Sequence, residues 1–553
     1  MNAATSAHVT PPDARLAASL LLLRDGAAGL EVLMLRRAER EGDLRSGAAV
    51  FPGGVLDARD RDAHPYCTGA DDAALSARLG LAAGGLDYAV AALRECFEEV
   101  GLLLAEGEFD LGALQPWRHR LNDGRATMAE LCASFGLTLP VDRLVYCSHW
   151  LTPPGVPKRF DTRFFAALAP VGQQALADLG EAVELMWLTP AAALEPARGL
   201  KLLPVTRRTL EELARHADAA SALAAARARE HITVTMPRLG RAGGKPRIVL
   251  PDELPWAEIG RLDPEGRGDV AAELRPGVPV RLSANVIRVT APNPGPMTGP
   301  GTNSYLVGSG DGESGSWTVI DPGPAIDAHV QALLAAAPGR ITRILVTHTH
   351  RDHSPAAAAL AAATGAPLWG RVADHPEWQD TGFVPAHVPR HGERFDAAPG
   401  VALRTVHTPG HASNHLCFLL EHERLLFTGD HVMQGSTVVI NPPDGDMAAY
   451  LRSLRALLDE DLQWLAPGHG FLVAEPHAVL RALIAHRLKR EAKVAAALAR
   501  LGPAPLAQLL PAVYDDVPAA LHPVAARSLT AHLLKLRGDG AAREDDAGNW
   551  SAH

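Results

Sequence analysis

The sequence predicts a multidomain protein that combines α/β and α+β domains, and three observations support this fold class. The chain has 553 residues, which is too long for one hydrophobic core, so three or four domains are expected. Strand-like and helix-like patterns are mixed over 14–203 and alternate again from residue 285. The segment 476–537 carries only helical patterns, which predicts a small helical or winged-helix-like domain.

In the first half of the chain, residues 1–13 are polar and contain proline, which predicts a disordered tail. A first domain is expected over 14–230, with strands at 16–24, 30–37, 143–151 and 183–188 and helices at 88–103 and 207–230. Glycine and proline are dense over 231–283, which indicates a connector with short strands.

In the second half, a domain is expected over 284–475, with strands at 303–308, 317–321 and 341–347 and a helix at 326–337. The third domain, 476–537, is expected to hold helices at 476–500, 504–514 and 521–537. The charged segment 538–553 is expected to be a tail.

Composition excludes several protein classes. With 47% apolar and 21% charged residues, the chain has the composition of a globular protein, and no stretch is long and apolar enough to cross a bilayer. The net charge of −10 disfavours nonspecific nucleic-acid binding by the whole surface. The cysteines form no C-x-x-C pair, which argues against a disulfide framework and favours a cytoplasmic location: Cys67, Cys96, Cys132, Cys147 and Cys417.

A first candidate site lies in the helix expected over 88–103. Glu95, Glu98 and Glu99 are spaced i, i+3 and i+4, so three carboxylates share one helix face. Their mutual repulsion is relieved by hard divalent cations such as Mg²⁺ or Mn²⁺, which prefer oxygen ligands. The alternative is a solvated acidic surface.

The string Arg94-Glu-Cys-Phe-Glu-Glu-Val-Gly-Leu102 resembles the second half of the Nudix box, and Phe51-Pro-Gly-Gly54 resembles its first half. Asp60 stands where the family pattern has Glu, and the helix comes late, so an insertion separates the two halves. With Arg159-Phe-Asp-Thr-Arg-Phe-Phe165, these features are similar to the coenzyme A diphosphatase-like branch. The resemblance implies a Nudix fold that cleaves a nucleotide-linked diphosphate, coenzyme A being one candidate.

In this resemblance Glu95, Glu98 and Glu99 bind the metal ions, and Glu98, Glu99 and Arg94 are the catalytic residues. Arg94 is expected to orient the carboxylates through charge-assisted hydrogen bonds.

A second candidate site follows the apolar run Ile344–Val346, where residues 348–353 read His-Thr-His-Arg-Asp-His. Alternate residues of an extended segment point the same way, so His348 and His350 can bind one ion. A turn at Arg351 then lets Asp352 and His353 face a second ion. A lone histidine such as His329, His387 or His522 is better explained by an ordinary polar contact.

More candidate ligands follow at spacings that fit one site. We expect His411 to complete the first ion's ligands and His469 the second's, with Asp430 bridging both. Imidazole and carboxylate ligands without thiolate favour two Zn²⁺ ions, with Mn²⁺ or Fe²⁺ as alternatives. Such a pair would activate water for attack on a phosphoryl or carbonyl centre, and Asp352 is expected to orient it.

These motifs resemble the metallo-β-lactamase superfamily, which implies an αββα sandwich with metals at one edge of the sheets. Supporting strings are Asp321-Pro-Gly-Pro324, Thr408-Pro-Gly-His411, Thr428-Gly-Asp430 and Pro467-Gly-His-Gly470. Residues 285–537 are similar to the β-lactamase-like protein 2 group, through Asn293-Pro-Gly-Pro-Met297 and Gly301-Thr-Asn-Ser-Tyr305. That similarity implies an endoribonuclease acting on single-stranded RNA.

The segment 481–500 contains six basic residues and one acid, Glu491, and this excess could guide a phosphate backbone or form a solvated helix face. The leading hypothesis is a two-headed metal-dependent hydrolase acting on a nucleotide diphosphate and on a phosphodiester such as single-stranded RNA. In one alternative the second head is a thioesterase or glyoxalase-II-like enzyme. In another the Nudix domain is a non-catalytic nucleotide sensor. No membrane partner is expected, and nothing in the sequence specifies the oligomeric state.

Overall fold

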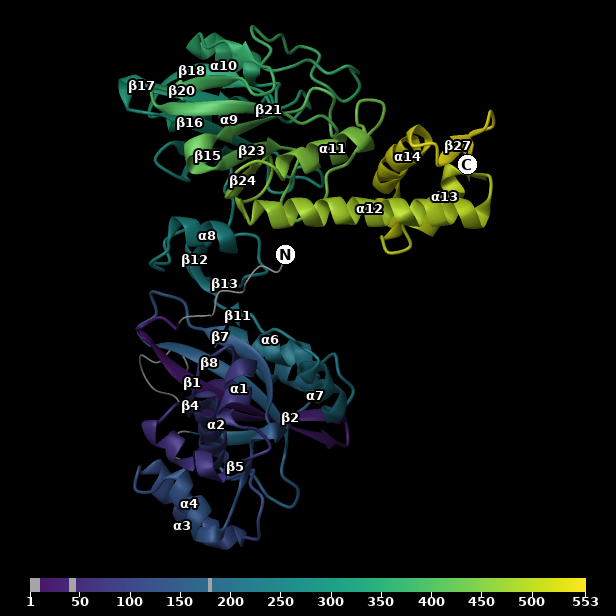
Figure 1. Cartoon of the computed structure of the whole chain (residues 1–553). Helices are drawn as coiled ribbons and strands as arrows, with labels where there is room; N and C mark the ends of the chain where they lie inside the picture. The colour runs from purple at the N-terminus through teal and green to yellow at the C-terminus, as the bar shows by residue number, and fades with distance from the viewer. Residues whose placement is uncertain (1–9, 39–45, 178–181) are drawn as a thin grey trace. The chain divides into compact units, whose positions relative to one another are not determined.

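The computed structural model describes residues 10–38, 46–177 and 182–553, and the chain forms two compact units (Figure 1). The first ends at Leu239 and also includes Glu265–Arg267; the second holds Gly240–Pro264 and Gly268–His553. Most of the predicted tail 1–13 lies outside the described residues. Its last part contacts the first unit, where Asp13 accepts a hydrogen bond from Arg159 at 2.8 Å.

A nine-stranded sheet forms the centre of the first unit. Its order is β10 (Lys201–Leu202), β3 (Ala48–Val50), β2 (Gly29–Arg37), β1 (Ala14–Gly26), β8 (Arg159–Leu168), β7 (Val145–Leu151) and β11 (Val234–Thr235), with β4 (Gly53–Val55) on β1 and β9 (Ala182–Leu188) on β2. Strand β1 is apolar throughout its centre because both faces are buried. Leu20 and Leu22 face one core, and Leu21 and Leu23 face the other.

Helices cover both faces of this sheet. Helix α2 (Gly85–Val100) packs on one face beside α1 (Asp72–Leu79), α3 (Leu111–Asn122) and α4 (Met128–Phe135). On the other face lie α5 (Pro190–Leu194), α6 (Pro204–Leu213) and α7 (Ala219–Arg227). The single helix predicted over 207–230 is wrong: it is interrupted before Asp218, whose carboxylate accepts a hydrogen bond from the Ser221 amide and caps a new helix.

The insertion predicted between the two Nudix motif halves is a folded segment. It comprises a 3-10 helix at Ala58–Tyr66, strand β5 (Cys67–Thr68), which pairs with β6 (Leu139–Pro140), and helix α1. Helix α1 packs on α2, and the Ser76 hydroxyl accepts a hydrogen bond from the Gly85 amide at 2.8 Å. The insertion therefore buttresses the start of the helix that carries the glutamates.

The second unit contains an αββα sandwich. One six-stranded sheet is β14 (Val280–Arg281), β15 (Val286–Thr290), β16 (Asn303–Ser309), β17 (Gly312–Ile320), β18 (Gly339–Leu345) and β19 (Leu368–Trp369). The other is β20 (Arg394–Ala398), β21 (Val401–His407), β22 (Leu416–Leu420), β23 (Leu425–Gly429), β24 (Trp464–Pro467) and β25 (Val473–Ala474). Tyr305 and Ile320 from the first sheet meet Phe418 and Phe427 from the second in a shared core.

The outer faces of the sandwich are covered by helices, as the predicted fold class requires. Helices α9 (Asp327–Ala336) and α10 (Ala357–Thr364) pack on the first sheet, and α11 (Met447–Leu457) and α12 (Pro476–Leu501) on the second. Among the described residues, no helix has both the length and the apolar character needed to span a membrane.

The connector predicted over 231–283 is divided between the units rather than standing as a separate linker. Its first part adds β11 to the first unit, followed by the hairpin β12 (Arg238–Ala242) and β13 (Lys245–Val249). Helix α8 (Trp256–Leu262) belongs to the second unit. Its buried Glu258 receives two hydrogen bonds from Arg288 of β15, at 2.6 and 2.9 Å, so this part of the connector is anchored to the sandwich.

The C-terminal domain has a winged-helix architecture. After α12 the chain forms α13 (Leu506–Val513), α14 (His522–Gly538) and a three-stranded sheet. The order of this sheet is β26 (Ala504–Pro505), β28 (Asn549–Ala552) and β27 (Ala542–Glu544). The prediction that 538–553 is a tail is therefore wrong. Asp545 accepts hydrogen bonds from Ala547 and Asn549 in a tight turn, and the buried Trp550 returns the chain to the core.

Candidate metal centres

Seven potential ligands follow the carboxyl ends of four strands in the αββα sandwich. His348, His350, Asp352 and His353 lie in the loop after β18 of the first sheet. Strands β21, β23 and β24 of the second sheet are followed by His411, Asp430 and His469. The buried sheets hold these loops at one edge, so residues far apart in sequence meet there.

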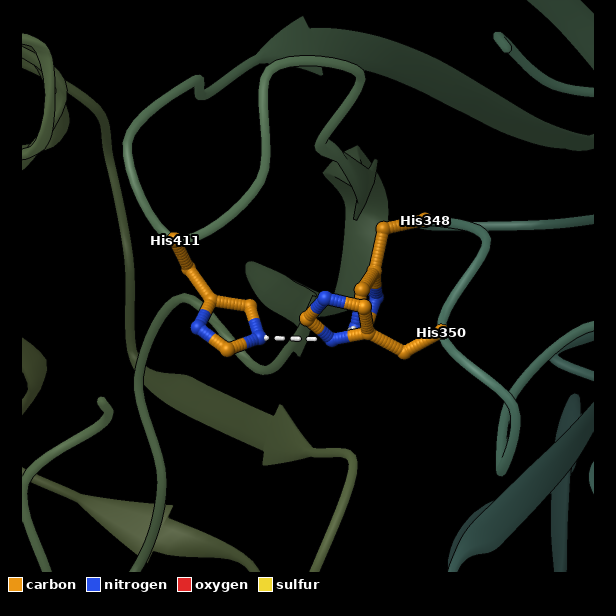
Figure 2. Close-up of side chains that lie close together, drawn as sticks. All are labelled: His348, His350 and His411. Carbon is orange, nitrogen blue, oxygen red and sulfur yellow. Dashed lines mark hydrogen bonds between the residues drawn. The ribbon is translucent and has the colours of Figure 1, made fainter. Parts of the chain in front are cut away.

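Three imidazoles form the first group (Figure 2). His350 Nδ1 lies 2.9 Å from His348 Nε2 and 3.0 Å from His411 Nε2. The other ring nitrogen of His411 donates to the Val439 carbonyl at 2.7 Å, and Thr347 Oγ1 lies 3.0 Å from His348 Nδ1. Since the Thr347 hydroxyl donates to Asp321, it accepts the His348 proton, and the inward-facing nitrogens are left for a ligand.

The second group pairs two imidazoles with two carboxylates. His469 Nε2 is 3.3 Å from Asp352 Oδ2 and 3.3 Å from Asp430 Oδ1, and His353 Nε2 is 3.3 Å from the same Asp430 oxygen. The other Asp430 oxygen lies 3.8 Å from His411 Nε2. Asp430 thus presents one oxygen to each group, which is the geometry expected of a bridging carboxylate.

The residues present fit a pair of divalent cations. Nε2 of His353, Nε2 of His469 and Oδ1 of Asp430 are buried, and their mutual contacts at 3.3 Å lack the geometry of hydrogen bonds. Orphaned polar atoms of this kind are costly unless something binds them. Two ligand atoms on a tetrahedral Zn²⁺ lie about 3.3 Å apart, which matches the observed separations. All seven candidates belong to groups whose atoms lie within 4.8 Å of one another.

Electrostatics differ between the two groups. Burial, aided by His411, lowers the pKa of His350 to about 3, so the three-histidine group is neutral near pH 7. Burial opposes charge in the second group, but His353 and His469 lower the pKa of Asp352 to about 2. Likewise, Asp430 and Asp352 overcome burial and raise the pKa of His469 to about 10. Metal binding in the second group must therefore displace protons held between histidine and carboxylate.

Asp321 supports both groups, a role that the sequence did not reveal beyond its place in a motif. Its oxygens accept hydrogen bonds from the Thr347 amide at 2.7 Å, the Thr347 hydroxyl at 2.8 Å and His353 Nδ1 at 2.9 Å. These contacts fix the start of the 348–353 loop and the tautomer of His353. The backbone of Asp321 has φ 53°, a region that few residues other than glycine adopt.

The Nudix-like candidate site is organised around Arg94. Its guanidinium donates to Asp60 at 2.7 Å, to Glu95 at 2.8 Å and to Glu98 at 3.0 Å. Asp60, only 2% exposed, also accepts from the Asp57 amide at 2.8 Å, so it fixes Arg94 although the family pattern has Glu there. The amide of Gly53 donates to Glu99 at 2.8 Å and ties the glycine loop to the helix.

The three glutamates share one side of α2, and two of them, Glu95 and Glu98, meet at Nη1 of Arg94. In the described part of the chain, ligand groups of three within 4.8 Å occur only in the second unit. Burial outweighs the nearby charge of Arg94 and raises the pKa of Glu98 to about 7. Beside it lies a pocket of about 180 Å³, lined by Asp57, Arg59, Asp60, Arg94, Glu98, Asn122 and Thr127 among others.

Three of the six basic residues of α12 are used in packing or ion pairs. Arg487 donates to the Val438 carbonyl, next to the residue that anchors His411. Arg490 pairs with Asp516 at 2.7 Å, and Lys493 pairs with Asp515 at 2.5 Å. Two of the six basic residues, Arg490 and Lys493, are thus compensated by carboxylates, whereas Arg481, Lys489 and Arg500 are exposed.

Comparison with known proteins assigns families to each part of the chain. Residues 297–469 match the family model described as metallo-beta-lactamase superfamily, residues 70–203 the NUDT19 Nudix domain, and residues 506–550 the beta-lactamase associated winged helix domain. A relative in Drosophila melanogaster, a beta-lactamase-like protein 2 homolog, is 32% identical over 48% of this chain and 91% of its own length.

A second relative, an atrochrysone carboxyl ACP thioesterase from Aspergillus chevalieri, is 32% identical over 47% of this chain and 83% of its own length. A solved NUDIX hydrolase from Alicyclobacillus acidocaldarius covers 38% of this chain and 96% of its own, at 26% identity and a TM-score of 0.33.

Proposed function

The chain belongs to the metallo-β-lactamase superfamily and carries a NUDT19-type Nudix domain, which makes it a metal-dependent hydrolase, and from this premise we propose what its two heads cleave. The second head would hydrolyse a phosphodiester such as single-stranded RNA. The first would cleave a nucleotide-linked diphosphate such as that of coenzyme A. The observation that carries the proposal is the meeting of seven imidazole and carboxylate side chains from four loops at one sheet edge.

In the second head, His348, His350 and His411 would hold one ion, and Asp352, His353 and His469 the other, with Asp430 between them. Two Zn²⁺ ions suit these ligands and, when bound, lower the pKa of water and polarise the scissile bond. The side chain of Asp352 is 25% exposed, against 11% for Asp430, so it faces solvent and can orient the attacking water. Thr302 donates to Asp352 at 3.2 Å and orients it.

A thioester is the second candidate substrate for this head. The relative named as a thioesterase is as similar to the chain as the beta-lactamase-like protein 2 homolog. A coenzyme A-directed Nudix domain beside a thioester-cleaving domain would also share one family of substrates. RNA remains the leading candidate because the similarity to the beta-lactamase-like protein 2 homolog covers more of that relative's length.

In the first head, Glu95, Glu98 and Glu99 would hold Mg²⁺ or Mn²⁺, and Arg94 would keep their carboxylates in place. Cations that approach Glu98 favour its ionised form, against the burial that raises its pKa to about 7. The alternative is a sensor that binds a nucleotide without cleaving it, because among the described residues the glutamates form no group of three ligand atoms within 4.8 Å of one another.

The test assigns each activity to one head. The purified full chain is assayed with coenzyme A, nucleoside diphosphate sugars, single-stranded RNA and S-lactoylglutathione, with and without chelator. The double variant Glu98→Gln/Glu99→Gln should lose diphosphate cleavage and keep RNA cleavage. His350→Ala should do the reverse and lose at least one metal equivalent by elemental analysis, whereas His387→Ala, a partly exposed histidine paired with Glu393, should keep both.

Diphosphate cleavage that persists in the double variant would refute the carboxylate mechanism, and its absence from the parent protein would favour the sensor. Unchanged metal content in His350→Ala would refute the ligand assignment.

A further inference from the structure

An indole and a guanidinium from different domains lie together beside the metal centre of the αββα sandwich, which is called the second metal centre below. Trp378 belongs to the loop between β19 and β20, and its side chain is 56% exposed. Arg527 lies on α14 of the winged-helix domain, and its Cζ is 5.2 Å from the centroid of the Trp378 ring. An exposed indole offers a flat ring on which a base or another planar group can stack.

The loop that carries Trp378 is fastened to the metal-binding loop. Gln379 pairs with His350 in an isolated antiparallel bridge, and its side chain accepts a hydrogen bond from the Thr349 hydroxyl at 2.7 Å. The Asp380 amide donates to the Thr349 carbonyl at 2.6 Å. Trp378 is therefore one residue from the partner of a candidate metal ligand, and its position relative to the metal centre is fixed.

The backbone of Trp378 has φ 67°, a conformation that residues with a β-carbon rarely adopt. Such conformations persist where the surroundings impose them, and they are concentrated at binding and catalytic sites. Here the Gln379 and Asp380 contacts impose it, and the result is an indole that stays exposed.

Two guanidinium groups come close to this part of the chain: Arg527 contacts the indole, and Arg351 adjoins the bridge between His350 and Gln379. Within the described residues, neither Arg527 nor the exposed Arg351 has a carboxylate partner within ion-pair distance. Arg351 follows His350, so it flanks the bridge at the same end as Trp378. On a chain of net charge −10, two uncompensated guanidinium groups beside an exposed indole favour an anion attached to a flat ring.

We propose that Trp378, Arg527 and Arg351 form a nucleotide-binding platform at the mouth of the second metal centre. A base stacks on the indole, and a phosphate is held by the guanidinium groups. The inference rests on the proposed hydrolase function of this centre and specifies nucleobase-bearing substrates as its class. RNA and the adenine nucleotide of a coenzyme A thioester both carry this chemistry, whereas a glutathione thioester does not.

The test compares ligands with and without a base. Affinities for hexa-adenylate, an abasic hexamer, acyl-coenzyme A and acyl-pantetheine are measured on the full chain by stopped-flow fluorescence, before turnover. Trp378→Ala should weaken binding of a base-bearing ligand about tenfold and leave its base-free counterpart unchanged, and Trp378→Phe should restore most of the affinity. Arg527→Gln should lower the slope of log affinity against log salt concentration by the amount expected for about one phosphate contact. Val388→Ala, which changes an exposed apolar residue of the same loop, is the control.

A loss confined to hexa-adenylate identifies RNA as the source of the base, and one confined to acyl-coenzyme A identifies the thioester. The platform is refuted if Trp378→Ala binds all four ligands as the parent does, weakens base-free ligands equally, or weakens binding no more than Val388→Ala does. Elemental analysis must give the same metal content for all variants. Binding is measured separately from turnover, so the two proposals can fail independently. If the parent is inactive but Trp378→Ala still weakens binding of base-bearing ligands, only the hydrolase function is refuted.

Discussion

Replacing Asp321 by Asn tests whether this carboxylate prepares the second metal centre. Asp321 accepts three hydrogen bonds, two from Thr347 and one from His353 Nδ1. An amide of the same shape has one oxygen and one NH₂ group, so at least one of the three donors would face another donor. Asn tolerates positive φ, so the backbone at φ 53° is preserved and the change is confined to hydrogen bonding.

The magnitude follows from the burial of these groups. A buried donor without an acceptor costs about 1–3 kcal/mol, which corresponds to about 5- to 150-fold in an equilibrium constant. If His353 changes tautomer instead, its Nε2 becomes protonated and is no longer available as a ligand. We therefore expect Asp321→Asn to lower metal affinity about 10- to 100-fold, in line with the loss of other groups that orient metal ligands.

The assay is a competition titration with a chromogenic chelator, which reports the affinity of each metal equivalent, alongside thermal unfolding of the metal-free protein. Asp311→Asn, in the exposed turn between β16 and β17, is the matched control and should bind metal as the parent does. An Asp321→Asn protein that binds both metal equivalents with the affinity of the parent would refute the reasoning.

Three further predictions concern other parts of the chain. Glu258→Ala leaves Arg288 buried and unpaired and should lower the free energy of unfolding of the second unit by about 3–5 kcal/mol in denaturant titrations, whereas the exposed Glu313→Ala should be neutral. Burial lowers the pKa of His329 to about 4, so the folded protein favours the neutral imidazole. The free energy of unfolding should therefore be highest above about pH 6.5 and fall as the pH drops toward 4, by about 2 kcal/mol at pH 5. If unfolding of His329→Gln depends on pH as strongly as that of the parent, this prediction is contradicted. Arg94→Lys cannot reach three carboxylates at once and should reduce diphosphate cleavage about 10- to 100-fold in initial-rate assays; a full rate would show that Arg94 orients nothing.

Near both sites, the predicted strand and helix agree with the structure because each has a regular hydrophobic pattern within its own segment. The strand predicted over 341–347 is β18, Gly339–Leu345, and the helix predicted over 88–103 is α2, Gly85–Val100. The predictions were wrong where one or two residues determine the path of the chain. Asp218 caps a new helix and so splits the one predicted over 207–230, and the turn at Asp545 folds the segment 538–553 into the wing of the C-terminal domain. Neither feature changes the average hydrophobic pattern of its segment.

The sequence by itself determined which side chains could act together within one element. The spacing of His348 and His350, and of Glu95, Glu98 and Glu99, fixes their relative directions because strand and helix geometry are repetitive. Only the tertiary structure decided which residues surround them: Asp321 behind His353, Asp60 behind Arg94, and Arg527 against Trp378. Those contacts join strands, helices and domains that are distant in the chain, and their positions depend on how the cores pack rather than on any local period.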